Sequence, residues 1–403
     1  MKTKIAIVGA SIAGSICSII LERLGFNITV FEKSKSNESI VDRGAGIWLP
    51  ETLIRALIDK NILSSDFPYI NIHERPIYTY DAKQNREHLL TSHHISSAAV
   101  NWMNLYEDLR KYRPETKIIY NAQVTQIEQN QQERIKLVVN EQQHHDFDYC
   151  LFTDGVHSIG RRYVFPTMQP TFANTIIWRG TLDNADEESV ARLLGKGIFY
   201  VCERGHLLMY LIPNQNNKGT EKKYKVNWLY YEMIDATHDL FQGDTKKASQ
   251  NVIKGTMSAT YRDYLHTAAQ KYFPDFPRRI ILTTEQPFIQ AIHEMLIPSY
   301  VAGNIGLIGD AGILLRPHTA VGATKAIQDA LALGEQLTIN TDIKSAVKTW
   351  NENQYLFGKK QFKLGQALGE LFVTHMPDWQ RTSKQQIDEM WQTTSANVCW
   401  YAA

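Results

Sequence analysis

The first thirty-two residues constrain the fold of this chain more than any other segment. The apolar run 4–8 predicts a buried strand, and a turn of small residues, 9–14, follows it. A helix then continues to Gly25, because glycine is typical just after the last helical residue. Residues 27–31 predict a second strand, which ends at Glu32. A strand–turn–helix–strand unit of this length favours a parallel sheet, so we expect an α/β fold.

The turn between the first strand and the helix has the spacing of a dinucleotide-binding fingerprint. Gly9, Ser11 and Gly14 occupy its three small-residue positions, and Glu32 stands 18 residues after Gly14. Small residues let the backbone approach a pyrophosphate at a helix N-terminus, where free N–H groups favour anions. An acid after the second strand can accept hydrogen bonds from ribose hydroxyls. The pattern therefore predicts a dinucleotide site, and the alternative is a glycine-rich turn in an unrelated α/β protein.

Composition excludes several classes of partner. The chain has 403 residues, which predicts two or three structural units, and its 43 Lys+Arg against 42 Asp+Glu leave a net charge of +1. This balance gives no electrostatic reason for nucleic acid or an anionic membrane to bind. No apolar stretch is long enough to span a membrane, and we interpret the amino-terminus as folded structure rather than a signal peptide. The four cysteines show no paired spacing, which indicates reduced thiols and a cytoplasmic chain.

The middle of the chain differs from its start. Alternating, aromatic-rich runs indicate an antiparallel sheet there, and residues 69–95 predict strands of another layer. Strands are predicted at 123–128, 134–139, 147–153, 175–180, 198–203, 206–212, 225–231 and 304–308, with a further strand after Ile280. Helices are predicted at 102–110, 246–270 and 322–337 and through the tail after residue 341.

Two more motifs follow predicted strands. The first is Asp154-Gly155, and the second is Gly309-Asp310, followed by Arg316-Pro317-His318-Thr319-Ala320 and a helix beginning near Gly322. Each Asp-Gly or Gly-Asp pair alone is ordinary turn chemistry. In this order and spacing, after the amino-terminal fingerprint, the chain resembles the single-component FAD-dependent aromatic hydroxylases, which share the para-hydroxybenzoate hydroxylase fold.

Within that family the chain is most similar to the 2,6-dihydroxypyridine 3-hydroxylase branch. The segments that carry this similarity are Trp178-Arg179-Gly180, Gly205-His206, Val226-Asn227-Trp228, the run 316–320 and Gly322-Ala323-Thr324-Lys325-Ala326. The resemblance implies a Rossmann-like parallel sheet that binds FAD, an inserted antiparallel substrate domain and a helical C-terminal tail. The expected FAD-binding domain comprises 1–70, 96–165 and 281–340; the substrate domain comprises 71–95 and 166–280; the tail is 341–403.

The resemblance also implies residues that hold FAD noncovalently. Glu32 would hold the adenosine ribose, Val124 would lie near adenine, and Asp310 would bind the ribityl chain or the pyrophosphate. Arg43 would lie over the phosphates or the flavin edge, and Pro317 with the 322–324 backbone would lie beside the isoalloxazine ring. The complete expected set is Gly9, Ser11, Ile12, Ala13, Gly14, Glu32, Lys33, Arg43, Val124, Asp154, Gly155, Gly309, Asp310, Pro317, Gly322, Ala323 and Thr324.

Two histidines are the candidates for acid–base chemistry. A near-neutral pKa would let His318 remove the proton of a phenol or pyridinol, and the alternative is that it only packs in the flavin loop. His206 is the second candidate, with a surface hairpin position as its alternative. Arg179, Tyr210 and Trp228 are the expected substrate contacts, although the aromatic residues could be core and the arginine a structural ion pair. No histidine, cysteine or carboxylate spacing predicts a metal site.

The implied activity is a flavin monooxygenase reaction. NAD(P)H would reduce FAD, O2 would add to give a C4a-hydroperoxide, and the distal oxygen would attack a small aromatic ring such as a phenol or hydroxypyridine. NAD(P)H would bind transiently, because the sequence contains no second strand–GxGxxG–helix unit. The alternatives are a flavin epoxidase or N-hydroxylase on the same fold, or a non-catalytic FAD-binding interaction protein. The expected partners are the aromatic substrate, O2 and a second copy of the chain in a homodimer.

Overall fold

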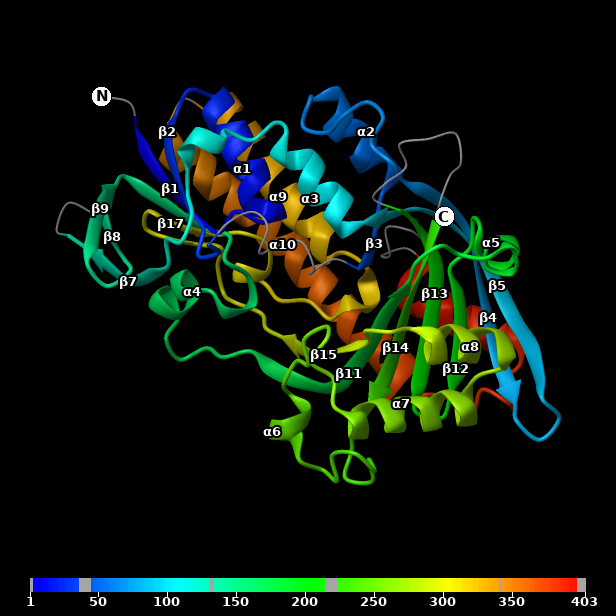
Figure 1. The fold of residues 1–403 in the computed structure, drawn as a ribbon. Helices are drawn as coiled ribbons and strands as arrows, with labels where there is room; N and C mark the ends of the chain where they lie inside the picture. Colours follow the sequence, from blue (N-terminus) through cyan, green and yellow to red (C-terminus); the bar gives the residue numbers. More distant parts are fainter. Residues whose placement is uncertain (1–2, 36–44, 131–133, 215–223, 341, 397–403) are drawn as a thin grey trace.

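The computed structural model describes residues 3–35, 45–130, 134–214, 224–340 and 342–396. Within these residues the strands form a six-stranded sheet, an eight-stranded sheet and a small three-stranded sheet. The six-stranded sheet lies on the left of Figure 1 and the eight-stranded sheet on the right, with helices packed on both.

The six-stranded sheet is mostly parallel. Its strands are β1 (Lys4–Val8), β2 (Asn27–Phe31), β6 (Ile118–Ile119), β10 (Tyr149–Phe152), β16 (Val301–Ala302) and β17 (Ile305–Leu307). The spatial order is β16-β17-β10-β1-β2-β6, in which β1 pairs in parallel with β2 and β10, and β10 pairs in parallel with β17. The carboxyl ends of these four strands therefore meet at one edge, where ligands bind in open α/β sheets.

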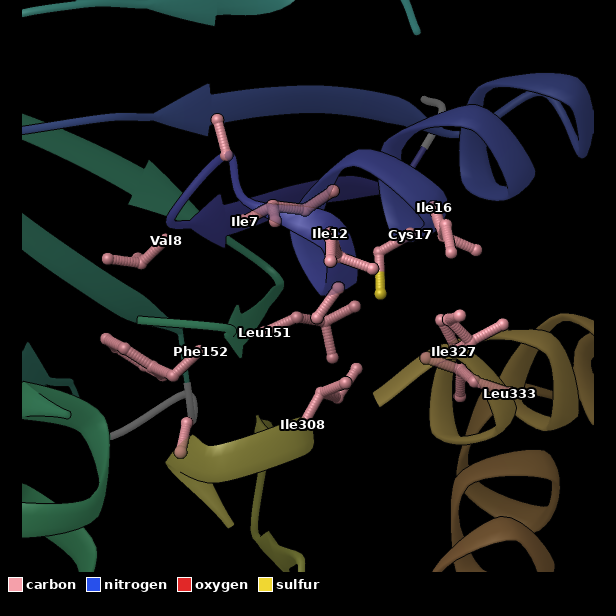
Figure 2. Packing of buried hydrophobic residues seen from close by; sticks show 14 of the residues in the cluster. Ile7, Val8, Ile12, Ile16, Cys17, Leu151, Phe152, Ile308, Ile327 and Leu333 are labelled. Atoms are coloured by element: carbon pink, nitrogen blue, oxygen red, sulfur yellow. The ribbon is translucent and has the colours of Figure 1, made fainter. Parts of the chain in front are cut away.

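Several helices pack against this sheet. Helix α1 (Ile12–Arg23) packs against α9 (Gly322–Ile339), and α9 packs against α10 (Ile343–Gly369), so that segments over 300 residues apart lie side by side (Figure 1). In Figure 2, Ile7 from β1, Ile16 from α1, Leu151 from β10 and Ile327 from α9 belong to one buried apolar cluster. Burying each such side chain stabilises the fold by roughly 1.5–3 kcal/mol. This burial holds the helices against the sheet.

The eight-stranded sheet is antiparallel except at one pair. Its strands are β3 (Gly46–Leu49), β4 (Ile70–Asp81), β5 (Arg86–Asn101), β11 (Thr171–Leu182), β12 (Ile198–Cys202), β13 (Gly205–Pro213), β14 (Tyr224–Met233) and β15 (Phe288–Glu294). The order is β15-β11-β14-β13-β12-β4-β5-β3, and only β12 and β4 pair in parallel. The long hairpin of β4 and β5 is thus an extension of the sheet formed by the middle of the chain.

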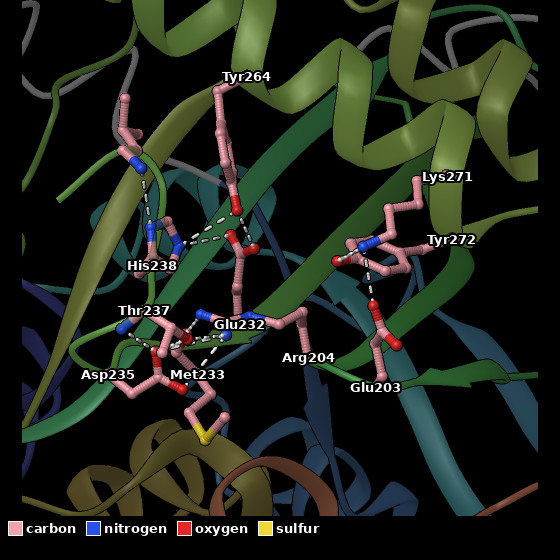
Figure 3. A network of polar contacts seen from close by, with 11 residues as sticks. Glu203, Arg204, Glu232, Met233, Asp235, Thr237, His238, Tyr264, Lys271 and Tyr272 are labelled. Carbon is pink, nitrogen blue, oxygen red and sulfur yellow. Dashed lines mark hydrogen bonds and ion pairs between the residues drawn. The ribbon is translucent and has the colours of Figure 1, made fainter. Parts of the chain in front are cut away.

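The outer face of this large sheet is covered by helices and held by a polar network. Helices α7 (Ala259–Tyr272) and α8 (Asp275–Thr283) run along it, and the short helix α6 (Thr245–Ala248) contacts β11 (Figure 1). Glu232 of β14 is fully buried there and accepts a hydrogen bond from Tyr264 Oη at 2.5 Å (Figure 3). It also accepts one from Trp178 Nε1 at 2.6 Å. Because a buried carboxylate is costly without partners, these bonds fix α7 against the sheet.

Smaller elements complete the molecule. They are α2 (Glu51–Asp59), α3 (Trp102–Arg110), α4 (Ile159–Val164), α5 (Glu187–Leu193), the three-stranded sheet of β7 (Val124–Gln129), β8 (Ile135–Val139) and β9 (Gln143–Phe147), and α11 (Lys384–Trp391). A π-helical turn, Glu370–Thr374, continues α10 toward the large sheet.

The structure confirms the expected fold class, an α/β parallel sheet with an antiparallel sheet and a helical tail. It corrects some boundaries. The run 147–153 divides at Asp148, since β9 belongs to the small sheet and β10 to the parallel sheet. The strand expected after Ile280 begins only at Phe288, because Ile280 to Thr283 complete α8. The domain boundaries stay a prediction, and β3, inside the segment 1–70, joins the large sheet.

Candidate active site

One cavity of about 1060 Å³ joins the two main sheets. It begins at the carboxyl edge of the parallel sheet, where Gly9 and Asp154 line it, and continues to the inner face of the large sheet, where His206 and Tyr210 line it. This volume is at the upper end of the range for ligand sites, which suits a dinucleotide together with a small second ligand.

The turn after β1 is shaped for close backbone approach. Gly9 has a φ of +101°, and a Cβ there would lie 2.8 Å from the carbonyl oxygen of Thr153. A Cβ on Gly14 would lie 1.9 Å from Gly9 O, so this glycine is needed for packing of the turn on α1. Ser11, the N-cap of α1, makes no side-chain capping hydrogen bond. The N-terminus of α1 therefore presents N–H groups to the cavity, as a pyrophosphate requires.

Glu32 lies where the second strand ends, as the sequence predicts. Its side chain is buried and lines the cavity. Ala10 N donates to Oε2 at 2.8 Å and Ser34 N donates to Oε1 at 2.9 Å, so two backbone groups fix the carboxylate. Each carboxylate oxygen can accept a further bond, which leaves acceptor capacity for ribose hydroxyls.

Two more carboxylates line the cavity between the sheets. Asp154 Oδ2 accepts a hydrogen bond from Ile159 N at 2.8 Å, whereas its buried Oδ1 has no hydrogen-bond partner among the described residues. The Asp310 side chain is accessible from the cavity, and burial in the surrounding protein raises its pKa, while Lys325 and Arg161 oppose that rise. These acceptors fit a ligand rich in hydroxyl groups, as the ribityl chain and ribose of FAD are.

A buried ion pair supports the Gly309-Asp310 turn from beneath. Lys325 Nζ donates to Asp329 Oδ2 at 2.8 Å and to Gly309 O at 3.0 Å, and Gly309 N donates to the same Oδ2 at 3.0 Å. On the other side, Arg161 donates to the Asp310 carbonyl oxygen at 2.9 Å. The backbone of the turn is thus held by two cations and a carboxylate, so that the Asp310 side chain remains available to the cavity.

The inner face of the large sheet forms the second part of the cavity, which we call the sheet pocket. Because successive residues of a strand point to opposite faces, alternate residues line it. They are Arg179 of β11, Phe199 of β12, His206, Leu208 and Tyr210 of β13, and Leu229 and Tyr231 of β14. The loop with Pro317 and His318 lines the same cavity.

His206 and His318 meet in this pocket. Their ring centroids are 5.9 Å apart, and the His206 ring stacks between Phe199 and Tyr231, whose centroids lie 5.3 Å and 4.4 Å away. Burial lowers the pKa of His206 to about 3, and burial also lowers the pKa of His318, helped by His206 and Arg316. The near-neutral pKa expected for His318 is therefore wrong in this structure, because the ring is desolvated. Both rings are neutral at physiological pH and can accept a hydrogen bond.

Arg179 is one of two arginines, with Arg75, that line this part of the cavity. Its Nη1 donates to Gln290 Oε1 at 2.9 Å and its Nη2 donates to Gly46 O at 3.1 Å. No carboxylate of the described residues pairs with it, so the expected alternative of a structural ion pair does not hold within that part of the chain. Burial lowers its pKa, and the neighbouring Tyr210 and Tyr231 oppose that change.

The C-terminal tail closes one side of the sheet pocket. Leu368, near the end of α10, and Phe372, in the π-helical turn, both line the cavity. Arg75 of β4 also lines it, and its guanidinium lies 3.5 Å from the ring centroid of Trp391 in α11. The tail is therefore part of the pocket wall.

The structure gathers most of the predicted site residues around this cavity. Those that line it are Gly9, Ser11, Ile12, Ala13, Glu32, Lys33, Val124, Asp154, Gly155, Arg179, His206, Tyr210, Gly309, Asp310, Pro317, His318, Gly322 and Ala323. Gly14 and Thr324 are buried beside it rather than lining it, and Arg43 lies outside the described residues. Trp228 is corrected: it points to the outer face, where Nε1 donates to Thr284 Oγ1 at 2.9 Å, because it alternates with the inward-facing Leu229.

Sequence reasoning missed several residues of the pocket. Tyr231 and Leu229 have the same alternation as the predicted Tyr210, so the strand pattern contained that signal. Leu368 and Phe372 are spaced by one helical turn, which shows an apolar face without showing what it covers. No sequence pattern pointed to Gln290, because the strand expected after Ile280 was predicted without saying which of its residues face the pocket.

The described part of the chain shows neither a metal-binding cluster nor a membrane-spanning helix. There, no group of three or more histidine, cysteine, aspartate or glutamate side chains could hold a metal ion. Across the same residues, none of the helices has both the length and the apolar character needed to cross a membrane.

Comparison with known proteins places this geometry among flavoproteins. A family described as FAD binding domain-like matches residues 172–294. The chain is 24% identical to 2,6-dihydroxypyridine 3-monooxygenase of Paenarthrobacter nicotinovorans over 87% of each chain. It is 23% identical to a salicylate hydroxylase of Pseudomonas putida over 83% of this chain and 76% of the relative.

The fold agrees with these relationships. The solved structure of 2,6-dihydroxypyridine-3-hydroxylase from Arthrobacter nicotinovorans superposes with a TM-score of 0.81 and 20% identity, covering 94% of this chain and 95% of that one. The open N-terminus of α1, the fixed Glu32 and the available Asp154 oxygen independently fit FAD. In sequence and in fold the chain is thus related to the FAD-dependent aromatic hydroxylases, and it is an FAD-dependent monooxygenase.

Proposed function

We propose that this protein uses NAD(P)H and O2 to hydroxylate a small aromatic or heteroaromatic ring that carries a hydroxyl group. One observation carries the proposal: a single cavity connects the nucleotide edge of the parallel sheet to a pocket of aromatic, imidazole and guanidinium side chains. The named activities of relatives, on 2,6-dihydroxypyridine and on salicylate, support this substrate class.

The chain's residues would divide the work between two regions. The N-terminus of α1, Glu32, Asp154 and Asp310 would hold FAD, and Pro317 would lie beside its ring system. Bound FAD, once reduced, supplies the activation of O2. The substrate ring would lie among Phe199, Leu208, Leu229 and Tyr231, whose apolar surfaces exclude water.

His318 would act on the substrate hydroxyl. A neutral imidazole can accept a hydrogen bond from the substrate hydroxyl, which increases electron density on the ring. His206 is a neutral ring that stacks on Tyr231 and lies beside His318, so it would hold the His318 ring in place without adding charge to the pocket.

NAD(P)H would be a transient co-substrate. The parallel sheet provides one nucleotide-binding edge, and the FAD contacts described above occupy it. We therefore propose weak NAD(P)H binding and slow flavin reduction when no aromatic substrate is present. The cytoplasmic location and the homodimer stay predictions.

The test is a screen of phenols and hydroxypyridines for stimulated NADH or NADPH oxidation, with products analysed for one added oxygen atom from isotopically labelled O2. His318→Ala is expected to keep the flavin spectrum but to release hydrogen peroxide in place of hydroxylated product. The matched control is Arg110→Gln, at the exposed end of α3, which is expected to behave as wild type. Loss of flavin from His318→Ala would show a structural role, and normal hydroxylation by it would exclude His318 as the base. A wild-type protein that consumes NAD(P)H without transferring oxygen to any of these compounds would contradict the proposed function.

A further inference from the structure

Arg179 lies in the sheet pocket without a compensating charge. Its Nε atom is buried and makes no hydrogen bond within the described residues, although Nη1 and Nη2 are each held by a neutral oxygen. A guanidinium has five N–H donors and keeps its charge in proteins, so these contacts use only part of its capacity.

The surroundings of Arg179 favour an anion rather than a neutral partner. Gln290 Oε1 and Gly46 O fix the plane of the guanidinium but carry no net charge. Burial raises the pKa of Tyr231 to about 12 and also raises that of Tyr210, so both remain neutral donors near neutral pH. A buried charge without a counter-charge is costly, and an anionic ligand would remove that cost.

The placement of the cation also gives the pocket a direction. On the sheet face, Arg179, Leu229 and Leu208 form one row across β11, β14 and β13, because Arg179 pairs with Leu229 and Leu229 pairs with Leu208. Tyr231 and His206 pair in the next row of the same face, so Arg179 and His206 lie on the two strands that flank β14. Arg179 and His206 are thus separated on this face by Leu208, Leu229 and Tyr231, which form a floor on which a flat ring could lie.

We propose that Arg179 binds an anionic oxygen of the aromatic substrate, a carboxylate or an ionised ring hydroxyl, and so selects anionic over neutral rings. This inference rests on the proposed function and specifies its substrate class. The anion at Arg179 would orient the ring so that a different ring position faces His318 and the flavin.

The experiment measures binding to the oxidised, FAD-loaded protein, without NAD(P)H, from the change in the flavin absorption spectrum. The probes are benzoate and salicylate, which carry a carboxylate, phenol, which is neutral, and 4-nitrophenol, followed through its ionisation. In Arg179→Gln, the dissociation constants of the carboxylates are expected to rise about 10- to 100-fold, as for loss of a charge-assisted hydrogen bond, while that of phenol changes less than about twofold. Arg179→Lys is expected to lie between, because it keeps the charge and loses the planar fork.

The two sources of the anion give different results. If Arg179 recognises a carboxylate, the affinity for benzoate depends on Arg179 and the affinity for 4-nitrophenol does not. If Arg179 recognises an ionised hydroxyl, 4-nitrophenol binds more tightly as it ionises, and it does so only when Arg179 is present. Arg110→Gln serves as the control for removing a charge at the surface.

Three results would overturn the proposal. One is an equal loss of affinity for phenol and for benzoate in Arg179→Gln, which would show that Arg179 has only a packing role. Another is a shift of the flavin reduction potential with unchanged discrimination between benzoate and phenol, which would show that Arg179 faces the flavin. The third is a wild-type protein that binds no anionic probe more tightly than Arg179→Gln does. Because no turnover is measured, a failure of hydroxylation alone would contradict the proposed function and leave the anion site standing.

Discussion

Replacing Lys325 by methionine tests how the Gly309-Asp310 turn is held. Lys325 is 1% exposed, and its Nζ makes two hydrogen bonds, to Asp329 Oδ2 and to Gly309 O. Methionine fills a similar volume but removes the charge and both donors. Asp329 is then left fully buried beside Gly309 N with no cation in hydrogen-bonding contact.

The expected cost follows from these contacts. Hydrogen bonds to charged groups contribute about 1.5–3 kcal/mol each, and breaking a buried ion pair from one side typically costs about 3–5 kcal/mol. We therefore expect Lys325→Met to lower the free energy of unfolding by about 3–5 kcal/mol. Burial raises the pKa of Asp329 and Lys325 opposes that rise, so the carboxyl would take up a proton in the variant more readily than in wild type.

The assay is urea unfolding of the FAD-loaded protein, followed by tryptophan fluorescence and by the release of flavin. The double variant Lys325→Met with Asp329→Asn removes the uncompensated charge while keeping an oxygen for Gly309 N, so it should recover at least half of the lost stability. Lys360→Met, on an exposed part of α10, is the matched lysine control and should change stability by less than about 0.5 kcal/mol.

The reasoning is refuted if Lys325→Met stays within about 1 kcal/mol of wild type. It is also refuted if the double variant is as unstable as the single one, since the loss would then come from side-chain volume rather than from an unpaired charge.

Two further predictions concern acid and the adenosine ribose. The pKa of His206 is about 3 in the folded protein against 6.5 in the unfolded chain. Between pH 3 and pH 6.5 the unfolded chain therefore binds more protons than the folded protein, so stability is lost as the pH falls below 6.5. Between pH 7 and pH 5 the loss from His206 alone should be about 2 kcal/mol in urea titrations, and His206→Phe should remove that part of the pH dependence. Glu32→Ala should raise the FAD dissociation constant roughly 100-fold, measured by flavin fluorescence, because it removes the acceptor for ribose and leaves two backbone N–H groups unpaired. Glu51→Ala, in α2 and outside the cavity, should leave FAD affinity unchanged; a similar loss in both variants would contradict the assigned role.

The sequence predicted those parts of the site that local patterns encode. The unit from Lys4 to Glu32 has strand, turn and helix signals within one short segment, and the structure has all of them at the expected residues. The motifs at Asp154 and Asp310 follow strands whose carboxyl ends meet, so parallel pairing alone brings them to one cavity.

The parts that were missed depend on contacts between distant segments. Alternation in β14 shows that Trp228 and Leu229 face opposite sides, but it does not show which side holds the ligand. The direct pairing of β4 with β12 joins residues more than 100 positions apart, and no local pattern specifies it. The depressed pKa of His318 likewise depends on how completely the folded protein excludes water around the ring.

The order of strands in the parallel sheet has a consequence for how this protein is made. Ile5 of β1 pairs with Tyr149 of β10, and Cys150 of β10 pairs with Ile305 of β17. At about 5–20 residues per second, a ribosome needs roughly 7–30 s to synthesise the residues between each pair. β1 of the nascent chain therefore has an unpaired edge until β10 is made, and β10 then has one until β17 is made. These edges need protection from aggregation during that time. Phe372, which closes the sheet pocket, leaves the ribosome later still, so the emerging chain can complete its nucleotide edge before it has a finished place for substrate.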